Sequence, residues 1–296
     1  MNKILLIGIT GQLGQELQHT LAPLGKVIGL SRQGLDLSQP NKIRQAIAAI
    51  KPNIIVNAAA YTAVDRAETE PELAKAINSV APTVMAEEAQ KRGATLVHIS
   101  TDYVFDGRNY TPYTEADSPN PIGVYGKSKL MGEEGVRKNC ARHLILRTAW
   151  VYGSRGHGNF VKTMVRLGGE REELRVVADQ IGTPTWSYDL AKAIAQLLSS
   201  YTEEVEISMG TYHFTNSGVA SWYDFAIAIF AEAQPLGFPL KIKRVAPITT
   251  AEYPTPARRP AYSVLSKVKI AKVLGDYPPY WRDSLKQMLV QWRSLN

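Results

Sequence analysis

Two tyrosines in this sequence are each followed, four residues later, by a lysine. The pairs are Tyr125 with Lys129 and Tyr188 with Lys192. On a helix this spacing places both side chains on one face, one turn apart. A phenol beside an ammonium group suits acid–base chemistry, because the phenol donates a proton and the positive charge lowers the phenol pKa from about 10. The spacing alone arises often by chance, so the surrounding sequence has to identify the functional pair.

Thr101 favours the first pair. It follows the apolar run 94–100, and Tyr125 opens the next expected helix, 123–139. Because ligands of parallel α/β sheets bind at the carboxyl ends of the strands, we expect Thr101, Tyr125 and Lys129 to meet there. The three groups suit reduction of a carbonyl by a nicotinamide cofactor. Tyr125 would protonate the oxygen, Thr101 would hydrogen-bond to it, and Lys129 would also hold the cofactor ribose.

The first apolar run, residues 3–9, leads into a glycine-rich turn. Gly8, Gly11 and Gly14 are spaced as Gly-x-x-Gly-x-x-Gly, with Gln12 and Leu13 opening the expected helix. Such glycines permit a tight turn, a close approach of backbone to a pyrophosphate and close packing of helix on strand. The helix N-terminus adds free N–H groups for the phosphates. The turn therefore predicts a dinucleotide site.

The ends of the second and third strands indicate which dinucleotide binds. A carboxylate after the second strand favours NAD, but Ser31 and Arg32 stand there instead. A hydroxyl and a guanidinium suit the 2′-phosphate of NADP, so we predict NADPH as the preferred cofactor, with NADH as the second option. The small residues Ala58 and Ala59 after the third strand would let the backbone lie close to the cofactor.

The pattern of apolar segments predicts how these groups are positioned. Strand-length apolar runs alternate with helix-length amphipathic stretches, which is typical of an α/β fold, a Rossmann-type doubly wound parallel sheet. The expected strands are 3–9, 26–31, 53–57, 94–100 and 142–148, and the expected helices are 12–24, 39–50, 71–91 and 123–139. We therefore assign residues 1–150 to an NADP(H)-binding Rossmann domain.

The alternation fades after residue 150. Residues 151–296 are expected to form a smaller, mixed region that mainly binds substrate, with some chain returning to the Rossmann domain. Its expected helices are 158–168, 187–198, 220–233 and 280–294, and its short strands are 174–177 and 211–214. A proline-rich segment, 247–260, is predicted to be a binding loop or a packed irregular segment.

Composition excludes several classes of protein. The chain has 296 residues and a formal charge of +7, concentrated in residues 241–296 with eleven basic and three acidic side chains. No nucleic-acid-binding motif accompanies this charge, so an anionic small molecule is the expected partner. No apolar run approaches the ~20 residues of a membrane span. The single cysteine, Cys140, cannot form an internal disulfide, which favours the cytoplasm.

Longer motifs relate the chain to a known family. The glycine turn and the Tyr125–Lys129 pair resemble the extended short-chain dehydrogenase/reductase superfamily. Other, more specific segments resemble the dTDP-4-dehydrorhamnose reductase family. Together with the two motifs they extend over nearly the whole chain, at residues 8–14, 57–65, 100–105, 125–129, 147–152, 158–164, 179–185 and 253–260. The resemblance implies NADPH-dependent reduction of the C4 keto group of dTDP-4-dehydro-L-rhamnose, the last step of dTDP-L-rhamnose biosynthesis for cell-envelope polysaccharide.

The resemblance also implies roles for individual residues. Thr101, Tyr125 and Lys129 form the implied catalytic set. On the cofactor side, Asp36 and Leu37 would lie beside the adenine, while Ala60, Tyr61 and Thr62 would line the site. The implied lining of the sugar-nucleotide pocket is Val64, Thr101, Asp102, Tyr103, Tyr125 and Trp150. Independently of the resemblance, Arg258 and Arg259 in the proline-rich segment offer charge-assisted bonds to the diphosphate of such a substrate, and Arg259 is the predicted substrate contact.

A metal site and the assembly are left open by the sequence. Some relatives hold Mg²⁺ between two subunits with acidic side chains. Glu16 is available for such a site, but residues 185–189 supply a single carboxylate, Asp189. The chain is expected to act as a monomer or a homodimer.

Alternative functions remain at this point. A nucleotide-sugar dehydratase is disfavoured, because such enzymes carry a glutamate where this chain has Tyr103. A 4-epimerase or another nucleotide-sugar reductase would use the same tyrosine and lysine, although an epimerase needs tightly held NAD, which Arg32 disfavours. A non-catalytic NADP-binding regulatory subunit is the alternative from a different class.

Overall fold

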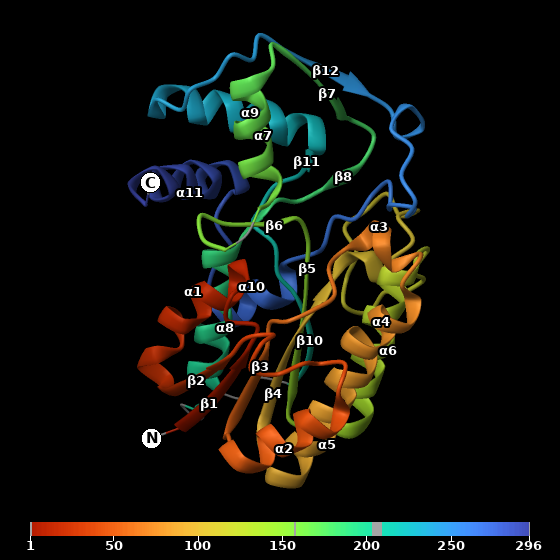
Figure 1. The fold of residues 1–296 in the computed structure, drawn as a ribbon, viewed down its shortest axis with the longest axis vertical. Coiled ribbons are helices and arrows are strands. Elements are labelled where there is room, and N and C mark those ends of the chain that lie inside the picture. Colours follow the sequence, from red (N-terminus) through yellow and green to blue (C-terminus); the bar gives the residue numbers. More distant parts are fainter. Residues whose placement is uncertain (1, 157, 203–208, 296) are drawn as a thin grey trace.

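A six-stranded sheet forms the centre of the molecule (Figure 1). The computed structural model describes residues 2–156, 158–202 and 209–295. Every neighbouring pair of strands in this sheet is parallel, and the spatial order is β10-β5-β4-β3-β1-β2. The strands are β1 (Asn2–Ile7), β2 (Gly25–Leu30), β3 (Ile54–Asn57), β4 (Thr95–Thr101), β5 (His143–Thr148) and β10 (Gly210–His213). The predicted Rossmann-type parallel sheet is confirmed.

Helices cover both faces of the sheet, which explains why its strands read as continuous apolar runs. Alternate residues of β1 enter different cores: Ile4 and Leu6 pack on one face, and Leu5 and Ile7 on the other. The first face is covered by α1 (Gln12–Thr20), α8 (Ser187–Thr202) and α10 (Val268–Leu274), and the second by α2 (Pro40–Ile50), α5 (Ala81–Arg92) and α6 (Val124–Asn139) (Figure 1).

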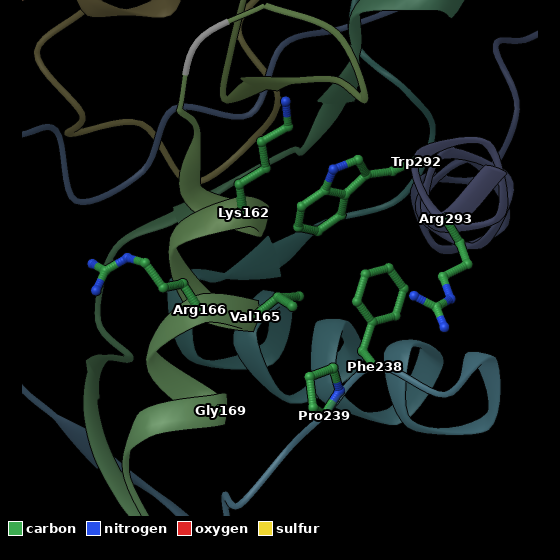
Figure 2. Close-up of a pocket in the computed structure, with 8 residues that line it drawn as sticks. All are labelled: Lys162, Val165, Arg166, Gly169, Phe238, Pro239, Trp292 and Arg293. Carbon is green, nitrogen blue, oxygen red and sulfur yellow. The ribbon is translucent and has the colours of Figure 1, made fainter. Parts of the chain in front are cut away.

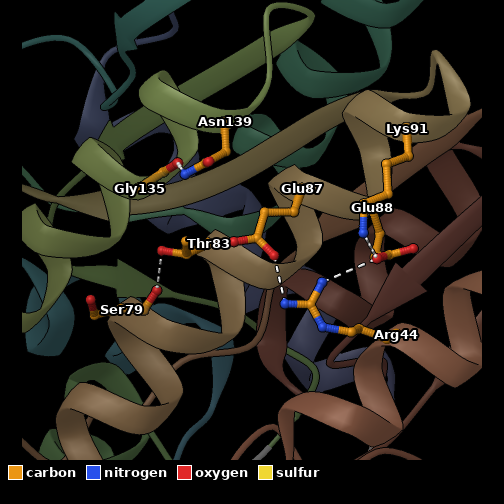
Figure 3. Close-up of polar contacts among 8 residues, drawn as sticks. All are labelled: Arg44, Ser79, Thr83, Glu87, Glu88, Lys91, Gly135 and Asn139. Atoms are coloured by element: carbon orange, nitrogen blue, oxygen red, sulfur yellow. Dashed lines mark hydrogen bonds and ion pairs between the residues drawn. The ribbon is translucent and has the colours of Figure 1, made fainter.

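The outer side of the second face carries ion pairs between α2 and α5. Figure 3 shows Arg44 of α2 reaching the carboxylates of Glu87 and Glu88, at 2.6 and 3.1 Å. Lys91 also contacts Glu88, at 2.8 Å. These partly exposed pairs add a modest stabilisation, of about 0–1 kcal/mol each, to the apolar packing beneath them.

Two helices predicted for the first half differ from expectation. The helix expected at 12–24 ends at Thr20 and is followed by the 3₁₀ turn η1 (Ala22–Leu24). The helix expected at 71–91 is divided into α4 (Pro71–Lys75), the π-helical turn η2 (Ala76–Val80) and α5. Pro82 explains the π turn, because it has no amide hydrogen to donate to the carbonyl of Asn78.

Short elements carry the site residues between the strands. They are α3 (Val64–Ala67), between β3 and α4, and the 3₁₀ turn η3 (Asp102–Val104), which follows β4 directly. Neither element was among the expected helices, because runs of three or four residues are too short to show helical periodicity.

A second lobe stands above the carboxyl edge of the sheet (Figure 1). Its aromatic-rich core lies among α7 (Phe160–Glu170), α9 (Trp222–Ala233) and α11 (Trp281–Ser294). Three two-stranded sheets surround this core: β7 (Glu173–Val177) with β12 (Arg244–Ile248), β8 (Ile181–Gly182) with β11 (Ala220–Ser221), and β6 (Val151–Tyr152) with β9 (Thr185–Trp186). The second lobe also contains the short 3₁₀ turns η4 (Gln234–Leu236) and η5 (Thr250–Glu252).

The chain after residue 150 contributes to both parts of the molecule. Strand β10 is an edge strand of the large sheet, and α8 and α10 cover one face of that sheet. The proline-rich segment 247–260 begins inside β12, where Pro247 is tolerated in a two-stranded sheet whose strands are both edges. The domain boundary at residue 150 stays a prediction. Within the described ranges no helix is long and apolar enough to cross a membrane.

Candidate functional site

A hollow of about 810 Å³ lies at the carboxyl edge of the large sheet, beneath the second lobe. All three residues of the predicted catalytic set line it. So do the predicted cofactor residues Gly8, Gly11, Gln12, Leu13, Ser31, Arg32, Asp36, Leu37, Ala58, Ala59, Ala60, Tyr61 and Thr62, and the predicted substrate residues Val64, Asp102, Tyr103 and Trp150. Among the predicted catalytic, cofactor and substrate residues, Gly14 and Arg259 are the two outside its lining.

Gly14 lies behind the hollow, where helix α1 packs on the end of β1. A Cβ at this position would stand 2.0 Å from the carbonyl oxygen of Gly8, so no larger residue fits. Gly8 itself has a φ of +94° and approaches the backbone of Ala59 closely. These two glycines therefore allow β1, the turn and α1 to pack this closely.

Gly11 is less closely packed than Gly8 and Gly14. The nearest described atom to a Cβ placed there would be the Gly8 carbonyl oxygen, at 3.4 Å, so the packing of the protein does not by itself require glycine here. Gly11 lines the hollow at the N-terminus of α1, where amide N–H groups are free to meet an anion. The space and the donors fit the pyrophosphate of a dinucleotide.

Arg32 gives the same end of the hollow a positive charge. It follows β2 and, among the described residues, forms no ion pair within 4 Å, so its planar fork can meet a phosphate. The nearby carboxylate of Asp36 accepts hydrogen bonds from Ser38 N (2.9 Å), Ser38 Oγ (2.7 Å) and Gln39 Nε2 (2.9 Å), which hold its pKa below the usual value. Asp36 thus shapes the turn after β2.

Thr101 ends β4 at the centre of the hollow. Its Oγ1 accepts a hydrogen bond from the amide of Tyr103 (3.2 Å) and donates one to Oδ1 of Asp102 (3.0 Å). Both Thr101 and Asp102 are buried. Burial raises the pKa of the Asp102 carboxyl to about 6, and the hydrogen bonds it accepts offset only part of that shift.

Tyr125 is the second residue of α6, whose first amide is capped from another element. Oε1 of Glu68 accepts a hydrogen bond from the amide of Val124 at 2.9 Å, which fixes the start of the helix. The ring of Tyr125 meets the ring of Tyr103 edge-on, with centroids 5.5 Å apart. Burial raises the pKa of the Tyr125 phenol to about 12, against the hydrogen bond to Thr101, which lowers it. The phenol is therefore neutral at physiological pH.

Lys129 lies one turn further along α6 and is also buried. Its Nζ donates to the carbonyl oxygen of Ile99 on β4 at 2.6 Å. Burial lowers the pKa of Lys129 to about 8, while the charge of Glu133 opposes that shift. The expected lowering of the Tyr125 pKa by Lys129 is not found, because burial disfavours the charged form of both side chains and dominates the pKa of the phenol.

The second tyrosine–lysine pair lies elsewhere. On α8, the Nζ of Lys192 stands 5.6 Å from the ring centroid of Tyr188, in a cation–π contact. Neither residue lines the hollow. The two tyrosine–lysine pairs have the same spacing, but only Tyr125 and Lys129 line the hollow.

Comparison with known proteins identifies the family. A family model described as the RmlD substrate binding domain matches residues 1–294. The dTDP-4-dehydrorhamnose reductase of Escherichia coli K12 is 44% identical over 290 residues, which cover 97% of this chain and 96% of that protein. This chain belongs to the dTDP-4-dehydrorhamnose reductase family.

Solved structures of the dTDP-4-dehydrorhamnose reductase family have the same fold. The structure from Clostridium acetobutylicum has 42% identity and a TM-score of 0.89, and the match covers 98% of this chain and 99% of that one. The structure from Bacillus anthracis, solved in complex with NADP, has 38% identity and a TM-score of 0.88, with the same coverage. The fold and the family predicted from the sequence are thereby confirmed.

Arg259 is held by a carboxylate beside the hollow. Its guanidinium donates to Oδ2 and Oδ1 of Asp65, at 2.8 and 3.2 Å, and Asp65 also accepts the amide of Ala257. Asp65 belongs to α3, next to Val64, which lines the hollow. The pair therefore joins the proline-rich segment to the wall of the hollow, and Arg259 does not enter it. Its predicted contact with a diphosphate stays a prediction.

Carboxylates considered for a metal in this family do not cluster in the described part of the chain. Glu16 is buried, and Oε1 lies 3.7 Å from the guanidinium of Arg155. Oδ2 of Asp189 accepts hydrogen bonds from Asn216 (2.7 Å) and Ser284 (2.6 Å). The described residues contain no group of three or more His, Cys, Asp or Glu side chains placed to hold an ion, so a metal shared between subunits stays open.

Trp222 also lines the hollow, and the sequence analysis did not predict it as a site residue. Its ring stacks on that of Trp150, with centroids 3.5 Å apart and planes 9° from parallel. Trp150 has a φ of +47°, a strained value for a residue other than glycine. Because the two tryptophans are 72 positions apart and one starts a helix in the second lobe, no local pattern in the sequence signals the stack.

A pair of partners for Tyr61 was also missed. The Tyr61 hydroxyl donates to Glu70 at 2.6 Å, and Arg66 pairs with the same carboxylate. Both Glu70 and Arg66 line the hollow. Their positions, 66 and 70, are one helical turn apart and could have been noted as an ion pair.

A second hollow, of about 420 Å³, lies in the second lobe between α7, α11 and the segment after α9 (Figure 2). Val165, Phe238, Pro239 and Trp292 form its apolar part. Its cations do not converge: Lys162 lies over the ring of Trp292, Arg293 lies over that of Phe238, and Arg166 pairs with Glu170. None of the predicted site residues lies here.

Proposed function

We propose that this chain reduces the C4 keto group of dTDP-4-dehydro-L-rhamnose with NADPH, giving dTDP-L-rhamnose. The observation that carries the proposal is the convergence of Thr101, Tyr125 and Lys129 in one hollow at the carboxyl edge of the sheet. The relatives described above, which are reductases of this substrate by name, support it. Bound NADPH supplies the hydride.

Each catalytic side chain has a distinct task in this proposal. Tyr125 gives its proton to the C4 oxygen, and its raised pKa keeps it in the neutral, donating form. Thr101 hydrogen-bonds the same oxygen. Lys129, anchored by the Ile99 carbonyl, would hold the ribose of the cofactor.

The two ends of the hollow suit the cofactor and the substrate. The glycine turn, Ser31 and Arg32 would bind the pyrophosphate and the 2′-phosphate of NADPH. At the other end, Tyr103 and the stacked Trp150 would cover the sugar or base of the nucleotide sugar, because aromatic faces pack well against flat or apolar surfaces.

Turnover with the named substrate tests the proposal. Purified protein is mixed with NADPH and freshly prepared dTDP-4-dehydro-L-rhamnose, and the loss of NADPH absorbance is followed. One NADPH consumed per sugar reduced is the expected result, and it excludes an epimerase or a dehydratase, which regenerate their cofactor. A folded protein that binds NADPH but does not turn over contradicts the proposal. Other 4-keto sugar nucleotides and a pull-down for a stoichiometric partner would then separate the alternatives.

Two further properties belong to the proposal. The buried thiol of Cys140 suits a reducing compartment, and we place the enzyme in the cytoplasm. We expect it to act as a monomer or a homodimer, which light scattering of the purified protein distinguishes.

A further inference from the structure

Asp102 is a buried carboxyl that the reaction outlined above does not use. Its side chain lies beside the catalytic Thr101, and both residues line the hollow. Oδ1 of Asp102 is 3.0 Å from the Thr101 hydroxyl oxygen, and the Ser263 hydroxyl also hydrogen-bonds the carboxyl. Burial of a charged carboxylate in such a place is costly, and protonation of the carboxyl would relieve that cost.

The hydroxyl of Thr101 has a single hydrogen to donate. Its oxygen accepts the amide N–H of Tyr103, and its hydrogen is directed at Oδ1 of Asp102. When Asp102 is ionised it can only accept, and it takes the Thr101 hydrogen. That hydrogen is then withdrawn from the carbonyl oxygen of a substrate.

We propose that Asp102 is a positioning residue whose protonation decides where Thr101 donates its hydrogen bond. With the carboxyl protonated, Asp102 donates to the oxygen of Thr101, and the Thr101 hydroxyl is free to donate to the C4 oxygen of the substrate. With the carboxyl ionised, Thr101 donates to Asp102 instead. This inference rests on the proposed reduction for its effect on rate, but the hydrogen bond it concerns exists without substrate.

The surroundings of Asp102 permit this switch near neutral pH. The groups that act on it are the hydroxyls of Thr101 and Ser263 and the adjacent backbone amides, and the titratable groups that its charge affects are the phenols of Tyr103 and Tyr125. The ion pair of Asp65 with Arg259 acts on Tyr103, one residue away. Since burial raises the pKa of Asp102 to about 6, both forms are accessible.

The pH dependence of kcat/KM tests the switch. For the wild type we expect kcat/KM to fall as the pH rises through the pKa of Asp102, by about tenfold per pH unit, before the separate loss caused by deprotonation of Lys129 near pH 8. The side chain in Asp102→Asn cannot ionise, so the fall in kcat/KM at the pKa of Asp102 (the lower limb of the profile) should disappear. The fall near pH 8 that is caused by Lys129 (the upper limb) should remain.

Asp106→Asn is the matched control. Asp106 lies in the same loop, where it accepts hydrogen bonds from Tyr113 and Asn120 at 3.0 Å, and it does not line the hollow. This variant should keep both limbs. A lower limb that persists in Asp102→Asn, or that disappears equally in Asp106→Asn, would overturn the inference.

A second measurement needs no turnover. The carboxyl resonance of Asp102, assigned by its absence in Asp102→Asn, is titrated by carbon-13 NMR in the NADPH-bound wild type and in Thr101→Val. Because the Thr101 hydroxyl stabilises the ionised carboxyl, its removal should raise the pKa of Asp102, whereas Asp106→Asn should leave it unchanged. An unchanged pKa in Thr101→Val contradicts the switch even if the proposed reduction fails, so the two failures are distinguishable.

Discussion

The guanidinium of Arg147 donates to both carboxylate oxygens of Glu133, at 2.9 and 2.7 Å, in a pair that is almost wholly shielded from solvent. Glu133 lies on α6, one turn after Lys129, and Arg147 lies on β5. The pair therefore ties the helix that carries Tyr125 and Lys129 to the sheet that carries Thr101.

Removing one partner of this pair should destabilise the fold. In Arg147→Met the buried carboxylate of Glu133 loses both hydrogen bonds from Arg147 but keeps its contacts with Arg137 and Ser100. We therefore expect the free energy of unfolding to fall by about 3 kcal/mol, the lower end for a broken buried pair. Urea denaturation followed by circular dichroism measures the change. Arg137→Met is the control, because Arg137 contacts the same carboxylate from a side chain that is 35% exposed and should contribute under about 1 kcal/mol. Equal losses in the two variants would contradict the role given to the buried pair.

His213 should make the stability depend on pH. Burial lowers its pKa from 6.5 to about 3, its Nδ1 lies 3.0 Å from the Tyr113 carbonyl oxygen, and Arg147 faces Nε2. The ring is neutral in the folded state, whereas the unfolded chain binds a proton below pH 6.5. The free energy of unfolding should therefore decrease as the pH falls from about 6.5 to about 3.

A substitution isolates the contribution of His213. His213→Gln removes the proton uptake of the unfolded state at this site, so the slope of stability against pH should be shallower between pH 6 and pH 4, in urea titrations at fixed ionic strength. His19→Gln, at an exposed position, serves as the control and should keep the wild-type slope. A slope that is unchanged in His213→Gln would show that other groups govern the dependence.

Much of the sheet was predictable because burial on both faces leaves a local signature. The five strands expected in the first half are found within a few residues of their predicted bounds, and the turn from β1 to α1 is signalled by glycines that the packing requires at positions 8 and 14. The Tyr125–Lys129 pair was separated from Tyr188–Lys192 by its place after β4. These features depend on neighbours in the sequence.

The features that were missed depend on residues far apart in the chain. The two-residue strands of the second lobe are too short for periodicity, and each pairs with a distant segment. The stack of Trp150 on Trp222, and the bond of Arg259 to Asp65, arise only when the second lobe is placed over the sheet. The Tyr125 pKa was misjudged because burial, which raises it, is a property of the folded molecule.

Tyr125→Phe should remove the proton donor without disturbing the fold. We expect kcat to fall by about 10²–10⁴, since general acid catalysis contributes a factor of this size, while the affinity for NADPH, measured by fluorescence titration, changes little. Tyr188→Phe is the matched control, because Tyr188 precedes a lysine by the same spacing but lies outside the hollow. Retention of wild-type kcat in Tyr125→Phe would exclude it as the donor.

Arg32→Asp should reverse the cofactor preference. The substitution removes a cation that can pair with the 2′-phosphate of NADPH and introduces a carboxylate that can bind the ribose hydroxyl of NADH. With about 1.5–3 kcal/mol for a charged hydrogen bond, kcat/KM for NADPH should fall by roughly 10- to 100-fold relative to NADH. Arg108→Asp makes the same charge change at an exposed position outside the hollow and should leave the ratio unaltered. An unaltered ratio in Arg32→Asp would remove the basis for the predicted preference.

Adjacent arginines in the proline-rich segment allow the role of Arg259 to be isolated. Arg259 is held by Asp65 beside Val64, whereas the neighbouring Arg258 is exposed. In Arg259→Ala the segment loses its link to α3, and a cation near the expected diphosphate is removed. We therefore expect the KM for the nucleotide sugar to rise by roughly tenfold or more, with a smaller change for NADPH. Arg258→Ala removes the same charge one residue away and should have little effect on either KM. If Arg259→Ala raises the KM for NADPH more than that for the sugar, Arg259 serves the cofactor, and its assignment to the substrate is wrong.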